Sequence, residues 1–131
     1  MVSSLVLLSF LLPFPSDSET LTSYSAAYAE AEREQKPLMV IVSSDACPAC
    51  VALKESTIDV MKSSGELSAV SYTIVNRDHD PQLASRLMRG KKIPQVILFS
   101  KGEVGWKRFQ LTGFQNTSGI RSLIRDATGR R

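Results

Sequence analysis

Cysteine and histidine are scarce in this sequence, and their scarcity limits the sites that the chain can build. The residues of these two types are Cys47, Cys50 and His79, in a chain of 131 residues. Because a structural zinc site needs four ligands, no metal site is expected, and a zinc half-site at the two thiols remains only as an alternative. A disulfide between such close cysteines closes too short a loop to restrain the unfolded chain. We therefore expect the pair to carry out chemistry, with a merely structural pair as a second alternative.

Long hydrophobic runs are absent as well. The apolar run over residues 5–12 is shorter than the roughly 20 residues that a membrane-spanning helix needs, so no stable membrane span is expected. This run, with the prolines and small polar residues after it, is typical of a secretory signal peptide. We expect residues 1–18 to be removed and the protein to be periplasmic or secreted, with residues 19–131 as its folded domain. The alternative is an N-terminal strand or docked arm, and then the protein is cytoplasmic.

A strong excess of either charge is also missing. The chain has 16 basic and 13 acidic side chains, a net charge of +3. No dense basic stripe with interleaved aromatic residues occurs, which disfavours nucleic-acid binding. With 43% hydrophobic and 22% charged residues, the composition is that of an ordinary globular protein. The length suits one domain with its own core, and we expect a monomer.

The pattern of apolar residues predicts helices that alternate with strands. The run over residues 38–42 is continuously apolar, which is typical of a strand that is covered on both faces. Alternating strands and helices indicate parallel βαβ units, and the last two strands form an antiparallel hairpin with a tight turn at Lys101-Gly102. The expected helices cover residues 20–35, 48–63, 81–89 and 117–127, and the expected strands cover residues 38–42, 70–75, 95–99 and 103–111.

Cys47 and Cys50 lie where the second helix is expected to begin. Pro48 suits the first helical position, so Cys47 becomes the residue that caps the helix. The unpaired backbone N–H groups and the positive end of the helix dipole favour the thiolate, which is the form that attacks a disulfide. Cys50 lies one turn further along, close enough to attack the mixed disulfide on Cys47. The spacing therefore supplies an attacking thiol and a shielded resolving thiol.

This arrangement resembles the thioredoxin family over residues 20–127. The motif of residues 47–50 follows a buried strand, Ile93-Pro94 precedes a later strand, and residues 99–104 resemble the family's hairpin. Residues 76–81 resemble the loop after the family's second βα unit. The resemblance implies an α/β thioredoxin fold with helices on both faces of a four-stranded mixed sheet. The strand order implied is 70–75, 38–42, 95–99, 104–111, with the first two strands parallel.

The resemblance also implies the site. Cys47 and Cys50 would be catalytic, and a cis Pro94 would lie against them. The backbone of Ile93 would then pair with an extended substrate. The remaining substrate-binding positions implied are Ala46, Pro48 and Gly113. No cofactor is expected, because the dithiol carries the electrons itself.

Several positions depart from the family pattern. Ile41 and Ile74 stand where the family has a buried carboxylate and its lysine partner, so Cys50 lacks the usual proton acceptor and water could serve instead. Asp45 and Lys54 are near in sequence, and we expect Asp45 to be a solvated loop residue. We expect His79 to lie on a loop surface far from the dithiol.

The expected function is thiol-disulfide exchange with protein thiols and disulfides as partners, together with an electron donor or acceptor that the sequence does not identify. Pro-Ala stands between the cysteines, where ordinary thioredoxins have Gly-Pro, so the direction of electron flow cannot be copied from the family. A disulfide oxidase or isomerase, and a thioredoxin-like binding module without turnover, are the alternatives.

Overall fold

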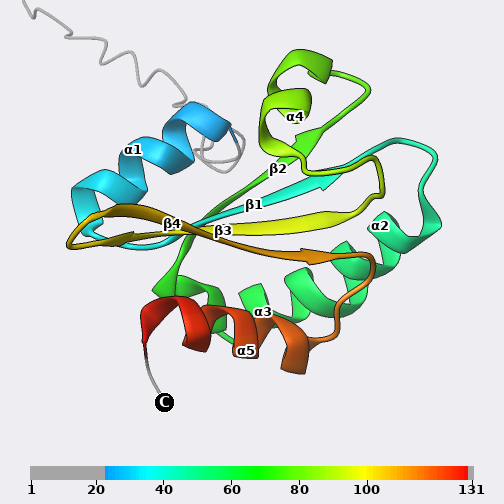
Figure 1. The fold of residues 1–131 in the computed structure, drawn as a ribbon. Helices are drawn as coiled ribbons and strands as arrows, with labels where there is room; N and C mark the ends of the chain where they lie inside the picture. Colours follow the sequence, from blue (N-terminus) through cyan, green and yellow to red (C-terminus); the bar gives the residue numbers. More distant parts are fainter. Residues whose placement is uncertain (1–22, 130–131) are drawn as a thin grey trace, which may run out of the picture.

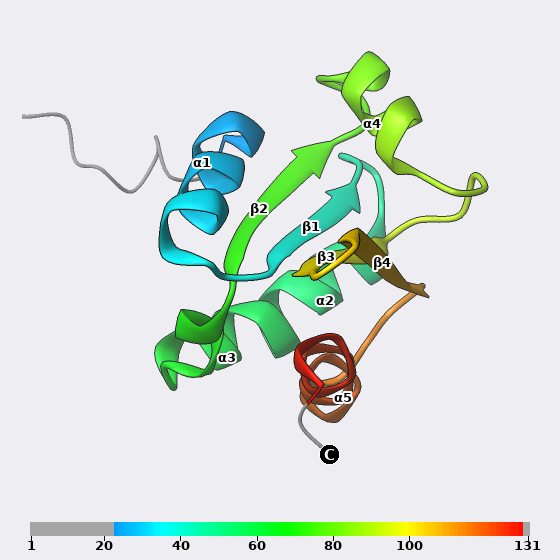
Figure 2. The same ribbon diagram turned by 60° about the vertical axis from the view of Figure 1, so that its left-hand side comes forward.

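A four-stranded sheet separates two groups of helices in the computed structural model, which describes residues 23–129. Helices α1 and α4 cover one face, and α2, α3 and α5 cover the other (Figures 1 and 2). The predicted signal peptide, residues 1–18, lies outside the described residues. The elements are α1 (Tyr24–Glu34), β1 (Leu38–Ser43), α2 (Pro48–Leu53), η2 (Lys54–Ile58), α3 (Asp59–Ser63), η3 (Glu66–Ala69), β2 (Ser71–Asn76), α4 (Pro81–Leu87), β3 (Gln95–Gly102), β4 (Gly105–Thr112) and α5 (Thr117–Thr128).

The sheet has the strand order β2-β1-β3-β4. Strands β1 and β2 are parallel, whereas β3 is antiparallel to both β1 and β4. The predicted α/β class, the mixed four-stranded sheet and its strand order are thus confirmed.

Strand β1 lies at the centre of the core. Met39 and Ile41 pack on the face that carries α2, α3 and α5. Leu38, Val40 and Val42 pack on the opposite face, against α1 and α4. Because both faces of the strand are covered, alternate residues point into two different apolar layers, which explains why the sequence of β1 shows no polar alternation.

The helix predicted over residues 48–63 is interrupted by a π-helical turn, η2. Thr57 and Ile58 are adjacent in sequence, yet they are 0% and 1% exposed. Both side chains enter the core at the C-terminal end of the π turn, which is locally wider than a regular α-helical turn. The Thr57 hydroxyl donates a hydrogen bond of 2.6 Å to the Gln115 carbonyl, which ties the π turn to the loop before α5.

Some predicted boundaries were wrong. The hairpin turn is not at Lys101-Gly102, because Lys101 pairs with Trp106 and Gly102 with Gly105, which extends both strands to a two-residue turn. The Lys101 ammonium lies 5.9 Å from the centre of the Trp106 ring, a contact that stabilises this longer pairing. The short 3-10 helix η3 before β2 was not predicted.

Candidate active site

The register of the sheet brings four loops to one end. Val42, near the end of β1, pairs with Gln95 at the start of β3. Ser43 pairs with Asn76 at the end of β2, and Gln95 also pairs with Thr112 at the end of β4. The loops that follow β1, β2 and β4, and the loop that precedes β3, therefore meet at the same edge of the sheet. This edge lies at the right of Figure 1, where β1 leads into α2.

Cys47 and Cys50 form a disulfide at this edge, with their Cα atoms 5.2 Å apart. Cys47 caps α2 and Pro48 follows at the first turn, as predicted. The Cys47 sulfur accepts a hydrogen bond of 3.2 Å from the Cys50 backbone N–H. A helix N-terminus that donates to this sulfur also stabilises a negative charge on it, so the geometry favours the Cys47 thiolate after reduction.

The exposed fractions of the two cysteines do not distinguish them in this oxidised state. Cys47 is 8% and Cys50 is 7% exposed. The greater accessibility that we expect for Cys47 therefore remains a prediction for the reduced thiols. Ala46 and Pro48, on either side of Cys47, are both exposed, so the disulfide is flanked by small apolar surface that a substrate can touch.

The Ile93–Pro94 peptide bond is cis, as the family resemblance implied. Pro94 is buried and its carbonyl accepts a hydrogen bond of 2.7 Å from the Gly113 N–H. Gly113 has a φ of 89°, a conformation that favours glycine. Among residues 23–129, no hydrogen bond uses the N–H or C=O of Ile93. These groups remain available to an extended peptide.

Beneath the dithiol, hydrocarbon replaces the family's pair of charges. A pocket of about 100 Å³ is lined by Cys50, Ile41, Ile74 and Lys54, among others. The Lys54 ammonium is 3.1 Å from an Asp59 carboxylate oxygen, so an ion pair already engages its charge. Within the described residues, no carboxylate lines the pocket that could accept the Cys50 proton.

The loop before Cys47 is held by polar contacts that the sequence did not reveal. The Asp45 carboxylate accepts a hydrogen bond of 2.8 Å from Asn76 and lies 3.1 Å from His79 Nε2. The Asp45 N–H donates to the Asp78 carboxylate at 2.8 Å. Asp45 and His79 are both exposed loop residues, as expected, but the contact between His79 and Asp45, two residues before Cys47, was not predicted. The pairing of Ser43 with Asn76 was the available signal, because it places the loops after β1 and β2 side by side.

Gln95 was also missed by the sequence analysis. Its side chain is fully buried, and its amide nitrogen donates to the carbonyls of Arg89 at 2.8 Å and Lys92 at 3.0 Å. Its amide oxygen accepts from the Arg89 N–H at 3.2 Å. A buried amide with these bonds fixes the backbone of the loop that leads into Ile93 and Pro94.

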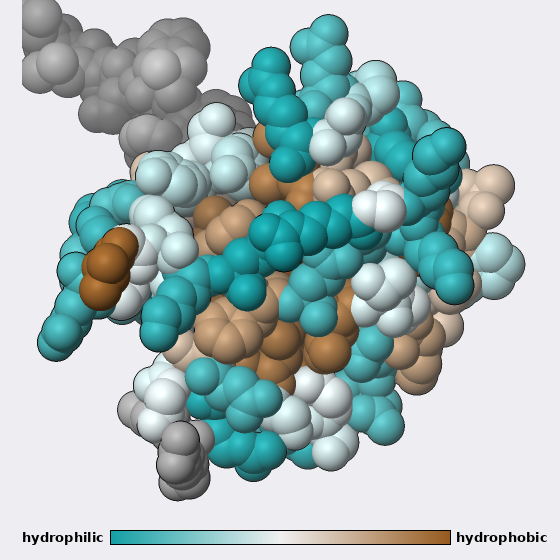
Figure 3. Space-filling model, viewed as in Figure 1, coloured by the Kyte–Doolittle hydropathy of each residue, from teal (hydrophilic) through white to brown (hydrophobic). Residues whose placement is uncertain are grey.

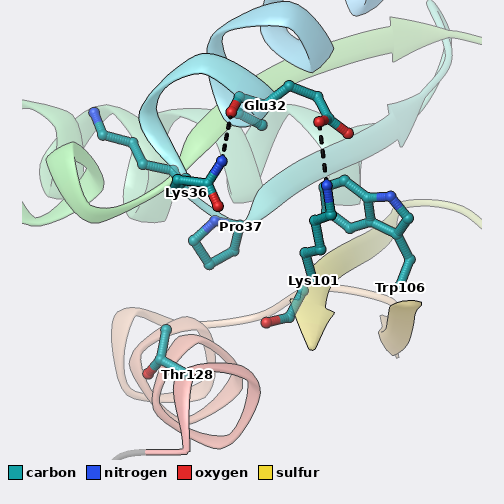
Figure 4. A pocket seen from close by; sticks show the side chains of 9 residues that line it. Glu32, Lys36, Pro37, Lys101, Trp106 and Thr128 are labelled. Carbon is teal, nitrogen blue, oxygen red and sulfur yellow. Dashed lines mark hydrogen bonds and ion pairs between the residues drawn. The ribbon is translucent and has the colours of Figure 1, made fainter. Parts of the chain in front are cut away.

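A larger pocket of about 190 Å³ lies elsewhere (Figure 4). It is lined by Pro37, which precedes β1, and by Lys101 and Trp106 of the hairpin. The dithiol follows β1, so the length of this strand separates the two places. Figure 4 shows Lys101 directed toward Glu32, at 3.4 Å, so a contact between α1 and the hairpin forms part of the wall of this pocket.

Two further features concern membranes and metals. No helix among residues 23–129 combines the length and the apolar character that crossing a bilayer requires. In the same residues, no group of three or more His, Cys, Asp and Glu side chains is arranged to bind a metal ion.

Comparison with known proteins places this geometry in context. A family model described as thioredoxin-like matches residues 19–101. A thioredoxin from Thermus thermophilus superposes with a TM-score of 0.67 at 22% identity, over 80% of this chain and 83% of that one. The thioredoxin of Trichomonas vaginalis gives 0.61 at 17% identity, over 79% and 90%. That of Fasciola hepatica gives 0.60 at 16%, over 82% and 96%. No curated protein sequence matches the chain.

Proposed function

Because this chain belongs to the thioredoxin-like family, we propose that it is a thiol-disulfide oxidoreductase that exchanges electrons with protein substrates through Cys47 and Cys50. The observation that carries the proposal is the disulfide between the residue that caps α2 and the cysteine one turn later. The unpaired backbone of Ile93 at the same edge supports a peptide as the substrate. The protein acts as a monomer and needs no cofactor.

The exchange proceeds in two steps from the reduced enzyme. The Cys47 thiolate attacks one sulfur of the substrate disulfide, so that a new S–S bond forms, the substrate S–S bond breaks, and its other sulfur leaves as a thiolate. Cys50 then loses its proton and attacks the Cys47 sulfur, which releases the second substrate thiolate. Two electrons pass to the substrate, and the Cys47–Cys50 disulfide remains. An external thiol or dithiol must reduce this disulfide again. In the reverse direction, the same steps oxidise a substrate dithiol and leave Cys47 and Cys50 reduced.

Insulin reduction tests the proposal. With dithiothreitol as electron donor, the wild-type protein should accelerate the precipitation of reduced insulin, and Cys47→Ser should not. A redox titration against glutathione then fixes the direction, because a strongly reducing midpoint indicates a reductase and an oxidising one a disulfide donor. Absence of insulin reduction, together with a disulfide that dithiothreitol does not reduce, would show a binding module instead.

We also propose that the protein works outside the cytoplasm, after removal of residues 1–18. The apolar run over residues 5–12 supports this proposal. Expression of the full chain in a bacterial host, followed by intact-mass measurement of the periplasmic and secreted fractions, tests it. The expected product lacks the first 16 to 20 residues, whereas a full-length cytosolic product would contradict export.

A further inference from the structure

Positive side chains surround the loop that leads into Ile93. Arg89, Lys91 and Lys92 lie in residues 88–94, between α4 and β3, and all three are exposed. Arg77, from the loop after β2, donates a hydrogen bond of 3.2 Å to the Lys91 carbonyl. No Asp or Glu occurs in residues 88–94, so every charged side chain of this loop is basic.

The buried Gln95 amide fixes this loop, because it bonds the backbone of Arg89 and Lys92. A fixed backbone presents the charged side chains from defined positions. The loop therefore loses less conformational entropy on binding a partner than a disordered basic segment would lose.

Arg108 of β4 adds a further charge. Its guanidinium lies 5.7 Å from the centre of the Phe99 ring. The guanidinium also donates a hydrogen bond to the Gln110 side chain, whose amide nitrogen donates one of 3.5 Å to the Arg89 carbonyl. The Nε atom of Arg108 is buried and has no hydrogen-bond partner among the described residues. Burial, and then the positive charge of Arg89, lower the pKa of Arg108. Two like charges thus lie near each other, and the neutral Gln110 side chain contacts both residues.

These cations are not neutralised within residues 23–129. We define the basic rim as Arg77, Arg89, Lys91, Lys92 and Arg108. The ion pairs of this part of the chain use other cations, namely Lys36, Lys54, His79, Lys101 and Arg121. Hydrophilic side chains gather beside the loop after α4 and over β4 in Figure 3. Unpaired cations beside the Ile93 backbone attract negative charge and steer it during association.

We propose that the basic rim binds acidic side chains of the protein substrate, on the segment that flanks the reacting cysteine. This inference rests on the proposed function and specifies its substrate. A peptide that pairs with the Ile93 backbone must pass Lys91 and Lys92, which precede Ile93 directly in the chain. The acidic residues are therefore expected on the stretch of substrate beside the part that pairs with Ile93.

Three disulfide peptides that differ only in their flanking residues test this preference. The flanks carry Glu, Ser or Lys, and kcat/KM is measured at low and at high ionic strength. At low ionic strength the Glu peptide should exceed the Lys peptide about tenfold, and high salt should remove most of the difference. Equal values for the three peptides at low salt would overturn the proposal.

Matched charge reversals locate the effect. Lys91→Glu/Lys92→Glu should reverse the preference between the Glu and Lys peptides. Lys62→Glu/Lys107→Glu makes the same change in net charge at two exposed lysines, one on α3 and one near the start of β4. This control should keep the wild-type preference for the Glu peptide over the Lys peptide. Thermal melts verify that both variants fold. An equal loss of preference in both would assign the effect to net charge and overturn the rim.

A binding experiment separates this inference from the proposed function. Cysteine-free versions of the three peptides are titrated into Cys47→Ser/Cys50→Ser protein, and amide shifts are followed by NMR. Tighter binding of the Glu peptide, with shifts concentrated in residues 89–93, supports the rim. This support stands even if the wild-type protein turns over no disulfide, because that failure would refute only the proposed function. Equal or absent binding of the Glu and Lys peptides would overturn the rim, whatever the activity.

Discussion

Ile41 of β1 lies directly opposite Ile74 of β2 in the parallel register of the sheet. Ile41 is 3% exposed, and both side chains line the pocket that reaches Cys50. Two hydrocarbon side chains therefore occupy the place from which a carboxylate could take the Cys50 proton. Burial in such surroundings disfavours the thiolate. Resolution of the mixed disulfide should therefore be the slower and more pH-dependent of the two steps.

Ile41→Asp should speed release of the substrate at neutral pH, because it places a proton acceptor beside Cys50. The same change should lower the free energy of unfolding by about 2–4 kcal/mol, since it replaces buried hydrocarbon with a buried polar group. Stopped-flow kinetics and chemical denaturation measure the two effects. Ile41→Asn is the matched control, with a similar loss of stability and no faster release. If Asp resolves no faster than Asn, another group or water already carries the proton.

The two cysteines should differ in reactivity once they are reduced. Limited alkylation followed by peptide mass mapping should label Cys47 first, because the start of α2 stabilises its thiolate. With a disulfide substrate, Cys50→Ser should accumulate a mixed disulfide on Cys47, and Cys47→Ser should not. Preferential labelling of Cys50 would reverse the assignment of the attacking thiol.

Gln95→Leu should loosen the loop before Ile93. The variant places an apolar side chain of similar size in the core but leaves the Arg89 and Lys92 backbone groups without their buried partner. We expect a loss of about 1–3 kcal/mol in the free energy of unfolding, measured by urea denaturation. Trypsin should also cut faster after Arg89, Lys91 or Lys92. Gln110→Leu, at a partly exposed position, should change neither property as much; equal effects would show that Gln95 does not control the loop.

The Arg121–Glu66 pair should make stability depend on pH. Arg121 donates two hydrogen bonds to the Glu66 carboxylate, at 2.6 and 3.2 Å. These bonds, with one from Ser64, hold the pKa of Glu66 below its ordinary value. A lowered folded-state pKa means that the pair stabilises the fold above the unfolded-state pKa of about 4.3, and that this stability is lost as the pH falls through the folded-state pKa.

Arg121→Gln should therefore lower the melting temperature slightly at neutral pH. The difference from wild type should vanish at about pH 2, where Glu66 is protonated. Arg125→Gln removes an equal charge from the same helix at a side chain that contacts Ser122 and should show no such pH dependence. A difference between wild type and Arg121→Gln that persists unchanged at acid pH would show that the pair acts by packing instead of charge.

The fold was predictable where local pattern and family resemblance agree. The continuous apolar run of β1, the proline after Cys47 and the Ile-Pro pair before β3 each specify local structure with little help from distant residues. The sequence positions of Ile41 and Ile74 were also sufficient to predict the hydrocarbon beneath Cys50, because the β1–β2 register of the family is kept.

Contacts between loops were not predictable in the same way. The Asp45–His79 contact spans 34 positions and depends on the directions of two loops after parallel strands. The burial of Gln95 depends on how the backbone of residues 88–94 folds around its side chain. The lack of ion pairs around Arg89 was not predictable either, because a basic segment in a sequence does not show whether acids elsewhere neutralise it. The π turn at residues 54–58 could not be predicted from periodicity, because adjacent positions such as 57 and 58 already share the apolar face of a regular helix.

The π turn has a consequence for how the length of the chain can vary. A π turn accommodates one more residue than an α-helical turn, and it does so without breaking the helix. It lies after α2, so the first turn, with Cys47 at its cap and Cys50 within it, is complete before the extra residue is reached. Deletion of one residue from the π turn should therefore convert it to an α-helical turn, and the dithiol at the start of α2 should keep its place.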